Sequence, residues 1–135
     1  MYVAETQIRV RYAETDQMGY AYYGNYASYY EVGRVEAMRQ LGFNYKELEK
    51  AGIMMPVTEL KCNFIKPATY DELLTIRVIV EEMPKVRILF QYEVLNESGE
   101  KINTGATTLV FINMSTNRPC RAPKSLLELL SAYYS

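Results

Sequence analysis

One segment sets the architecture of this chain: residues 24–41 read GNYASYYEVGRVEAMRQL, and Gly42 follows. Apolar residues recur at positions 26, 30, 33, 37 and 41, which is the spacing of one face of a helix, and Gly42 is a suitable C-cap. The segment predicts a helix about 25 Å long. Because apolar residues cover much of its circumference, we expect this helix to be largely buried. Gly33 in its interior favours a close approach of another backbone.

Alternating patterns on both sides of this helix predict strands. Ile8, Val10 and Tyr12 alternate with polar residues before it, as in a half-buried strand. After it we expect a short helix over 45–51, a terminal helix over 125–133 and, between them, strands over 59–64, 74–80, 86–94 and 102–114. An antiparallel sheet with one apolar face needs a cover, and the long helix is the best candidate. We predict a single α+β domain over residues 1–135, a five-stranded antiparallel sheet wrapped around the helix, which is the hotdog fold.

Composition narrows the classes of function. The 135 residues include 15 basic and 16 acidic side chains, so the balance favours no nucleic-acid partner. No apolar run has the length of a membrane span, and the first residues lack a signal peptide. Cys62 and Cys120 are far apart in sequence; a disulfide is open on sequence alone, but we expect reduced thiols and a cytoplasmic protein.

The chain contains no histidine. It therefore cannot build a Ser-His-Asp or Cys-His arrangement on its own, and its residues favour no zinc site. A general acid or base has to be Asp, Glu, Tyr or Lys. We expect no metal and no cofactor.

The residues just before the long helix carry the strongest indication of chemistry. Residues 11–26 read RYAETDQMGYAYYGNY, and Asp16 to Gly19 fit a type I turn. The turn places the Asp16 carboxylate ahead of a helix N-terminus, whose free N–H groups and partial positive charge suit a developing oxyanion. An aspartate there can act as a nucleophile or as a base toward water. The carboxylate and the helix N-terminus together indicate acyl transfer to water, although Asp16 could also have only the structural role of stabilising the turn.

These residues resemble the 4-hydroxybenzoyl-CoA thioesterase family, in its bacterial acyl-CoA thioesterase branch. The resemblance is carried by the motif over 11–16, by Gly19, by 25–26 and by the Tyr30-Glu31…Arg34 run, with weaker agreement over 64–73 and 118–123. It implies a hotdog fold, a homodimer or homotetramer with the site at the subunit interface, and Asp16 as the catalytic aspartate. Some relatives have histidine at the position of Tyr23 and others do not, which leaves the proton-transfer scheme open.

The neighbours of Asp16 and several cations are further candidates for the site, and the resemblance mainly supports the oxyanion role. We expect the N–H groups of Tyr23 and Gly24 to bind the oxyanion, unless the Asn25 side chain caps them. Tyr12 could hydrogen-bond the carboxylate or the substrate from the first strand, or be an ordinary buried tyrosine. The candidates for substrate binding, which include cations for the phosphates of coenzyme A, are Tyr22, Asn25, Tyr26, Lys66, Lys85 and Arg87, with Arg118 and Arg121 as further cations.

Two alternatives stay open at this stage. Glu31 is a second candidate carboxylate, or it only pairs with Arg34 at helical spacing. The predicted function is hydrolysis of an acyl-CoA thioester to a free acid and CoA, in which CoA arrives with the substrate. The alternatives are an acyl-acyl carrier protein thioesterase and a non-catalytic acyl-CoA binding module.

Overall fold

The structure is a computed structural model that describes all residues from Met1 to Ser135. Its elements follow in the order β1 (Tyr2–Arg9), α1 (Tyr26–Leu41), α2 (Tyr45–Lys50), β2 (Ile53–Met54), β3 (Val57–Phe64), β4 (Leu73–Val80), β5 (Arg87–Leu95), β6 (Lys101–Val110), β7 (Ile112–Asn113), β8 (Arg118–Pro119) and α3 (Lys124–Leu130). Short 3₁₀ turns cover Tyr12–Glu14, Tyr23–Asn25 and Ser131–Tyr133.

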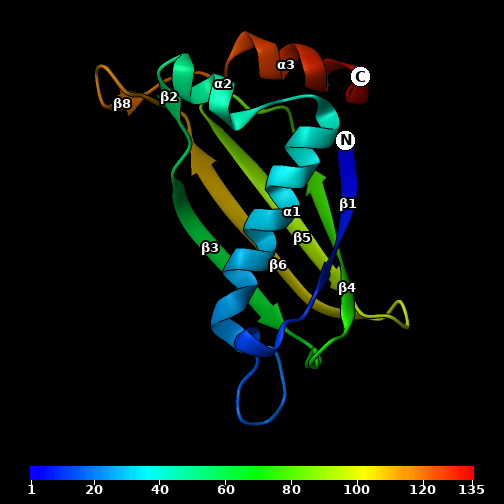
Figure 1. Cartoon of the computed structure of the whole chain (residues 1–135). Helices are drawn as coiled ribbons and strands as arrows, with labels where there is room; N and C mark the ends of the chain where they lie inside the picture. Colours follow the sequence, from blue (N-terminus) through cyan, green and yellow to red (C-terminus); the bar gives the residue numbers. More distant parts are fainter.

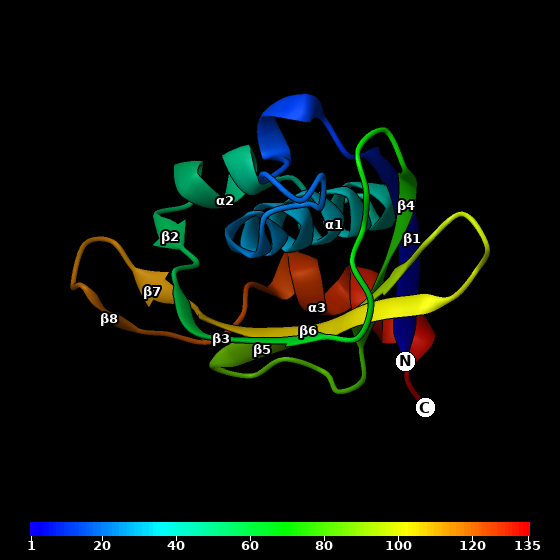
Figure 2. The same ribbon diagram turned by 90° about the horizontal axis from the view of Figure 1, so that it is seen from below.

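The five long strands form one antiparallel sheet in the order β1-β4-β5-β6-β3, which curls around α1 (Figures 1 and 2). This confirms the predicted sheet and its central helix. The last predicted strand is in fact divided, because β7 leaves β6 and joins β2 and β8 in a separate three-stranded sheet. Helix α3 lies across the end of the sheet where both chain termini are found (Figure 1).

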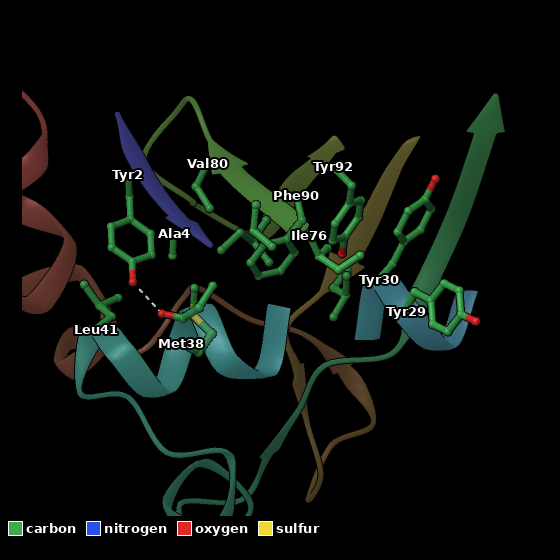
Figure 3. Packing of buried hydrophobic residues seen from close by; sticks show 14 of the residues in the cluster. Tyr2, Ala4, Tyr29, Tyr30, Met38, Leu41, Ile76, Val80, Phe90 and Tyr92 are labelled. Carbon is green, nitrogen blue, oxygen red and sulfur yellow. Dashed lines mark hydrogen bonds between the residues drawn. The ribbon is translucent and has the colours of Figure 1, made fainter. Parts of the chain in front are cut away.

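The core lies between α1 and the concave face of the sheet. Every second residue of β4, from Leu74 to Val80, is buried there, as the alternation predicts. Gly33 lets α1 pack closely on β4, since a Cβ at this position would lie 2.7 Å from Cγ2 of Ile76. The neighbour of Gly33 is therefore a side chain and not the backbone that we expected. Toward the C-terminal end of α1, the Tyr2 hydroxyl donates to the carbonyl of Ala37 (Figure 3).

Helix α1 is buried on one side only. Its sheet-facing residues, such as Tyr26, Tyr30 and Met38, are buried, whereas Val32 on the other side is 39% exposed. The expectation of a largely buried helix was therefore wrong for the outer half of its circumference. The helix also begins at Tyr26, because the preceding three residues form a 3₁₀ turn.

The N-terminal strand ends earlier than its alternating pattern suggests. Val10 is buried, but the backbone N–H of Arg11 donates to the Glu14 side chain at 2.9 Å, and the chain turns there. Tyr12 thus opens a 3₁₀ turn and is 80% exposed, so its predicted place on the apolar face of the first strand was wrong. The terminal helix is likewise shorter than predicted and continues as a 3₁₀ turn.

Strand β3 forms an open edge of the sheet. It pairs with β6 on one side, and seven of its eight residues are exposed, including Leu60 and Phe64. Among the helices of the chain, none has both the length and the apolar character required to cross a lipid bilayer. Both cysteine thiols are free.

Candidate active site

Asp16 sits in a closed turn at the end of the molecule where α1 begins. The N–H of Gly19 donates to the Asp16 carbonyl at 3.0 Å, and the N–H of Asp16 donates to the Tyr20 carbonyl at 2.8 Å. Gly19 has φ +78, a left-handed conformation that glycine adopts without strain. The turn predicted from residues 16–19 is confirmed.

The two oxygens of the Asp16 carboxylate have different surroundings. Oδ1 accepts the N–H groups of Met18 at 2.9 Å and Tyr20 at 3.2 Å. Oδ2 accepts no hydrogen bond from the chain, and the side chain is half-buried. One oxygen therefore fixes the orientation of the carboxylate while the other remains available for chemistry.

The start of the helix offers two free donors. The N–H groups of Tyr23 and Gly24 donate no hydrogen bond to any other group of the chain. The Asn25 side chain does not cap them, since its amide donates to the Glu14 carbonyl at 2.7 Å; that alternative was wrong. The Tyr22 ring packs against Gly24, where a Cβ would lie 2.6 Å from Cε2 of the ring.

A pocket of about 390 Å³ lies between this turn, the start of α1 and the end of β3. Its lining brings Asp16 and Tyr23 together with apolar and aromatic residues. The lining residues are Asp16, Met18, Tyr20, Ala21, Tyr23, Tyr26, Phe64, Ile65, Lys66 and Pro67.

Aromatic rings form one wall of this pocket. Phe64 makes edge-to-face contacts with Tyr26, at 5.2 Å between ring centroids, and with Tyr23, at 6.4 Å. Burial raises the pKa of Tyr26 to about 12. Tyr26 therefore stays protonated near neutral pH. Such a wall accommodates a flat apolar group better than a charged one.

The other predicted site residues are distributed unevenly. Lys66 lines the pocket and pairs with Glu100. Tyr22 and Asn25 lie beside the pocket, the first with its ring against that of Tyr23 at 4.5 Å and the second bonded to the turn. Tyr12 makes no hydrogen bond to Asp16; its ring contacts that of Tyr70 at 5.8 Å.

Lys85 and Arg87 lie at the opposite end of the sheet. Phe64, which lines the pocket, pairs across the sheet with Asn103, and Asn103 pairs with Val94 on β5. Arg87 is seven residues from Val94 along β5, which is roughly 23 Å at about 3.3 Å per residue. They line a groove of about 590 Å³ on the outer face of β5 and the preceding loop. Arg118 and Arg121 lie in and after β8, outside the Asp16 pocket.

Glu31 does not reach the pocket. Its carboxylate lies 4.0 Å from the Arg34 guanidinium, and the side chain of Glu31 is 68% exposed. The Glu31–Arg34 pair anticipated from helical spacing is present. No group of three or more His, Cys, Asp or Glu side chains is arranged to hold a metal ion.

Glu14 was not predicted as a site residue, although it lies two residues before Asp16 and forms hydrogen bonds with residues at the start of the helix. Its carboxylate accepts hydrogen bonds from Arg11 and Tyr29, and its carbonyl accepts the N–H of Tyr22. The spacing of Arg11 and Glu14 was visible in the motif, but the contact with Tyr29 depends on the tertiary fold. Met18 and Ile65 were also missed as lining residues.

Comparison with known proteins identifies the relatives of this chain. Residues 18–103 match the model of the thioesterase superfamily. An acyl-CoA thioesterase YbgC from Helicobacter pylori is 34% identical, covering 92% of this chain and 97% of that protein. A DHNA-CoA thioesterase structure from Staphylococcus aureus is 41% identical with a TM-score of 0.89, covering 98% of this chain and 89% of that one.

More distant structures share the fold. A 4-hydroxybenzoyl-CoA thioesterase solved with 4-hydroxybenzoyl-CoA has a TM-score of 0.85 at 19% identity, covering 96% of this chain and 99% of that one. The hotdog fold predicted from the strand and helix pattern is confirmed, and so is the resemblance drawn from the motif around Asp16.

Proposed function

The chain belongs to the thioesterase superfamily, and from this we propose that it hydrolyses acyl-CoA thioesters with Asp16 as the catalytic carboxylate. The observation that carries the role of Asp16 is its geometry. One carboxylate oxygen is fixed by two backbone N–H groups and the other accepts no hydrogen bond from the chain. Asp16 lines a pocket that Tyr23 also lines.

In the proposed reaction the thioester carbonyl enters this pocket with its oxygen toward the N–H groups of Tyr23 and Gly24. Oδ2 of Asp16 either attacks the carbonyl carbon directly or removes a proton from the attacking water. In the first route the C–S bond breaks, the CoA thiolate leaves and water hydrolyses the mixed anhydride. In the second, the water oxygen bonds to the carbonyl carbon, the C–S bond breaks as the tetrahedral intermediate collapses, and the CoA thiolate leaves. The proton taken by Asp16 then passes to the thiolate or to solvent. In both routes, the oxyanion is the charge that most needs stabilisation, and two free amide donors match that need.

The proposed reaction uses the chain's own residues and water, while coenzyme A arrives as part of the substrate. For the acyl group we propose an aromatic acid as the first candidate. The aromatic wall formed by Tyr23, Tyr26 and Phe64 supports this, as does the Staphylococcus aureus relative described as a DHNA-CoA thioesterase. The carrier-protein thioesterase and the non-catalytic acyl-CoA binding module are tested by the same experiment.

We further propose that the active form is a homodimer or homotetramer in which β3 meets a second copy. Its unpaired edge and exposed Leu60 support pairing with another strand. Phe64 belongs both to this edge and to the pocket, so such a dimer would place the site at the subunit interface. If the two β3 edges pair antiparallel, the far end of one sheet approaches the pocket of the other, and Lys85 and Arg87 of the partner subunit become candidates for the CoA phosphates.

The test is CoA-thiol release from short, long and aromatic acyl-CoAs by the wild type, Asp16→Asn and Asp71→Asn. Asp71 is the matched control because it is the only other aspartate, is exposed, and makes a 3.8 Å ion pair with Arg9. We expect Asp16→Asn to lose turnover by at least about 100-fold and to keep CoA-ester binding, while Asp71→Asn retains turnover.

Three other outcomes have defined meanings. Full turnover in Asp16→Asn would overturn the role of Asp16. Turnover with acyl-carrier protein but with none of the CoA esters would favour the carrier-protein alternative. Binding of acyl-CoA without turnover of any thioester by the wild type would favour the binding module.

A further inference from the structure

We propose that Glu14 is the positioning residue of this site, which holds the Asp16 turn and the start of the helix in one fixed arrangement. Glu14 is not part of the pocket lining and does not touch the substrate in this proposal. The inference deepens the proposed function and rests on Asp16 being the catalytic carboxylate.

The Glu14 carboxylate accepts four hydrogen bonds, from the loop after β1 and from helix α1. Oε1 accepts the backbone N–H of Arg11 at 2.9 Å and the hydroxyl of Tyr29 at 3.1 Å. Oε2 accepts both Nε, at 3.1 Å, and Nη2, at 3.0 Å, of the Arg11 guanidinium. Arg11 follows β1 and Tyr29 is buried on α1, so this carboxylate connects the strand side of the site to the helix.

The Glu14 backbone makes the second connection. Its carbonyl accepts the N–H of Tyr22 at 2.8 Å and the side-chain amide of Asn25 at 2.7 Å. These two residues flank Tyr23 and Gly24, whose N–H groups are the proposed oxyanion donors. Glu14 is also only two residues ahead of Asp16. A single residue therefore anchors the catalytic carboxylate and the proposed oxyanion donors to the same point.

The charge of Glu14 is part of this arrangement. Burial of the carboxyl raises its pKa, but the hydrogen bonds from Arg11 and Tyr29 outweigh that effect and the pKa is lowered overall. All four contacts to the carboxylate are donors, so its ionised form satisfies each of them. A glutamine would instead place an NH₂ group where one of the two oxygens lies, opposite two of these donors.

Catalysis depends on such anchoring because the other hydrogen bonds of the Asp16 turn close it on itself or join it to residues 68–70, and none of them reaches α1. Met18 at its tip is 70% exposed, and Gly19 follows it. Reacting groups have to be held close to their productive geometry, and a displacement of about 1 Å can cost a factor of about 100 in rate. Loss of the Glu14 contacts would free the turn to move relative to the helix start.

The experiment compares Glu14→Gln, Glu14→Asp and Tyr29→Phe with Glu36→Gln as the matched control. Glu36 forms an ion pair with Arg39 at the same three-residue spacing, but on α1 outside the pocket. The measurements are kcat and KM for CoA-thiol release and the folded fraction by thermal unfolding. We expect Glu14→Gln to lower kcat at least about tenfold with little change in KM. Glu14→Asp keeps the charge and should recover part of that loss, and Glu36→Gln should match the wild type.

A double variant tests whether Glu14 acts through the helix. If Glu14 positions the turn through Tyr29, then Glu14→Gln combined with Tyr29→Phe should be no slower than Glu14→Gln alone. Full additivity of the two effects would overturn this route. Unchanged kcat in a folded Glu14→Gln protein would overturn the proposal as a whole.

A purely structural role gives a different result, since kcat per folded molecule would then stay constant while only the folded fraction fell. If Glu14→Gln does not fold, Tyr29→Phe decides by the same criterion, because it keeps the buried ring. The assays with Asp16→Asn separate this proposal from the function itself. If Asp16→Asn loses turnover while Glu14→Gln keeps the wild-type kcat, only the positioning role of Glu14 is refuted.

Discussion

The hydroxyl of Tyr30, on α1, donates a hydrogen bond to Oδ1 of Asn103, on β6, in the centre of the core. Neither residue is exposed to solvent. The Tyr30 ring also stacks on that of Tyr92 on β5, with 4.2 Å between centroids and 6° between planes, and Figure 3 shows the two rings side by side. The helix is thus held in register on the sheet by a directional bond as well as by apolar burial.

We predict that Tyr30→Phe destabilises the protein by about 1–3 kcal/mol, because it leaves the buried Asn103 oxygen without its donor. Tyr45→Phe is the matched comparison. The Tyr45 hydroxyl is the only buried side-chain polar atom without a partner, so its removal should leave stability unchanged or raise it by about 1 kcal/mol. Urea unfolding of both variants checks this, and equal losses in the two would contradict it.

The two interior glycines of the helix–sheet contact should not tolerate a methyl group. A Cβ at Gly105 would lie 2.2 Å from the Tyr30 hydroxyl oxygen, and one at Gly33 would lie 2.7 Å from Cγ2 of Ile76. Overpacking costs about 1–3 kcal/mol, whereas alanine gains only about 1 kcal/mol over glycine in a helix. We therefore expect Gly105→Ala to lose more stability than Gly33→Ala in denaturant unfolding. A Gly33→Ala protein more stable than the wild type would refute the packing argument.

The sequence predicted the parts of the fold that depend on local periodicity. The buried face of β4 and the apolar stripe of α1 follow directly from residue spacing, as does the turn at Asp16. Tyr12 was misplaced because its pattern continues that of Ile8, while the chain bends at a contact between Arg11 and Glu14. That contact carries no signal in a period-two pattern.

The candidate site was predicted only where its residues are close in sequence. Asp16, Tyr23 and Tyr26 do line one pocket, but Lys85 and Arg87 lie at the far end of the sheet. Their distance from the Asp16 pocket depends on the register of three strands, β3, β6 and β5, which the sequence does not specify. The role of Tyr29 beside Glu14 depends in the same way on how α1 packs.

The buried tyrosines should make the protein sensitive to alkali. Burial raises the pKa of Tyr26 and Tyr45 to about 12, and it raises the pKa of Tyr30 as well. The unfolded chain ionises these groups near pH 10, so the folded state binds the protons more tightly and stability falls as the pH rises above about 10. Absorbance at 295 nm and circular dichroism should report ionisation of these residues and unfolding together. Their ionisation without loss of structure would contradict the prediction.

A ladder of ion pairs crosses the outer face of the sheet. Arg77 contacts Glu5 at 2.9 Å and Glu93 at 3.2 Å, and Lys101 contacts Glu93 at 2.7 Å. These side chains are partly exposed, so water and salt screen them. We expect Arg77→Met to cost at most about 1 kcal/mol at low ionic strength and less still in 1 M NaCl. A larger loss that persists in high salt would indicate a packing role for Arg77 instead.

The exposed edge of the sheet offers the last prediction. Leu60 is 49% exposed on β3, whose outer backbone groups have no partner strand. A charge in the middle of an edge opposes pairing with a second strand, so Leu60→Lys should shift a homodimer toward monomer in sedimentation velocity. Val3→Lys is the control because Val3 is similarly exposed, at 44%, on the opposite edge strand β1. If turnover requires the β3 interface, CoA-thiol release should fall with dissociation in Leu60→Lys alone. A fully active monomer would refute the interfacial site. If Val3→Lys shifted the protein toward monomer as much as Leu60→Lys does, the assignment of the interface to β3 would be contradicted.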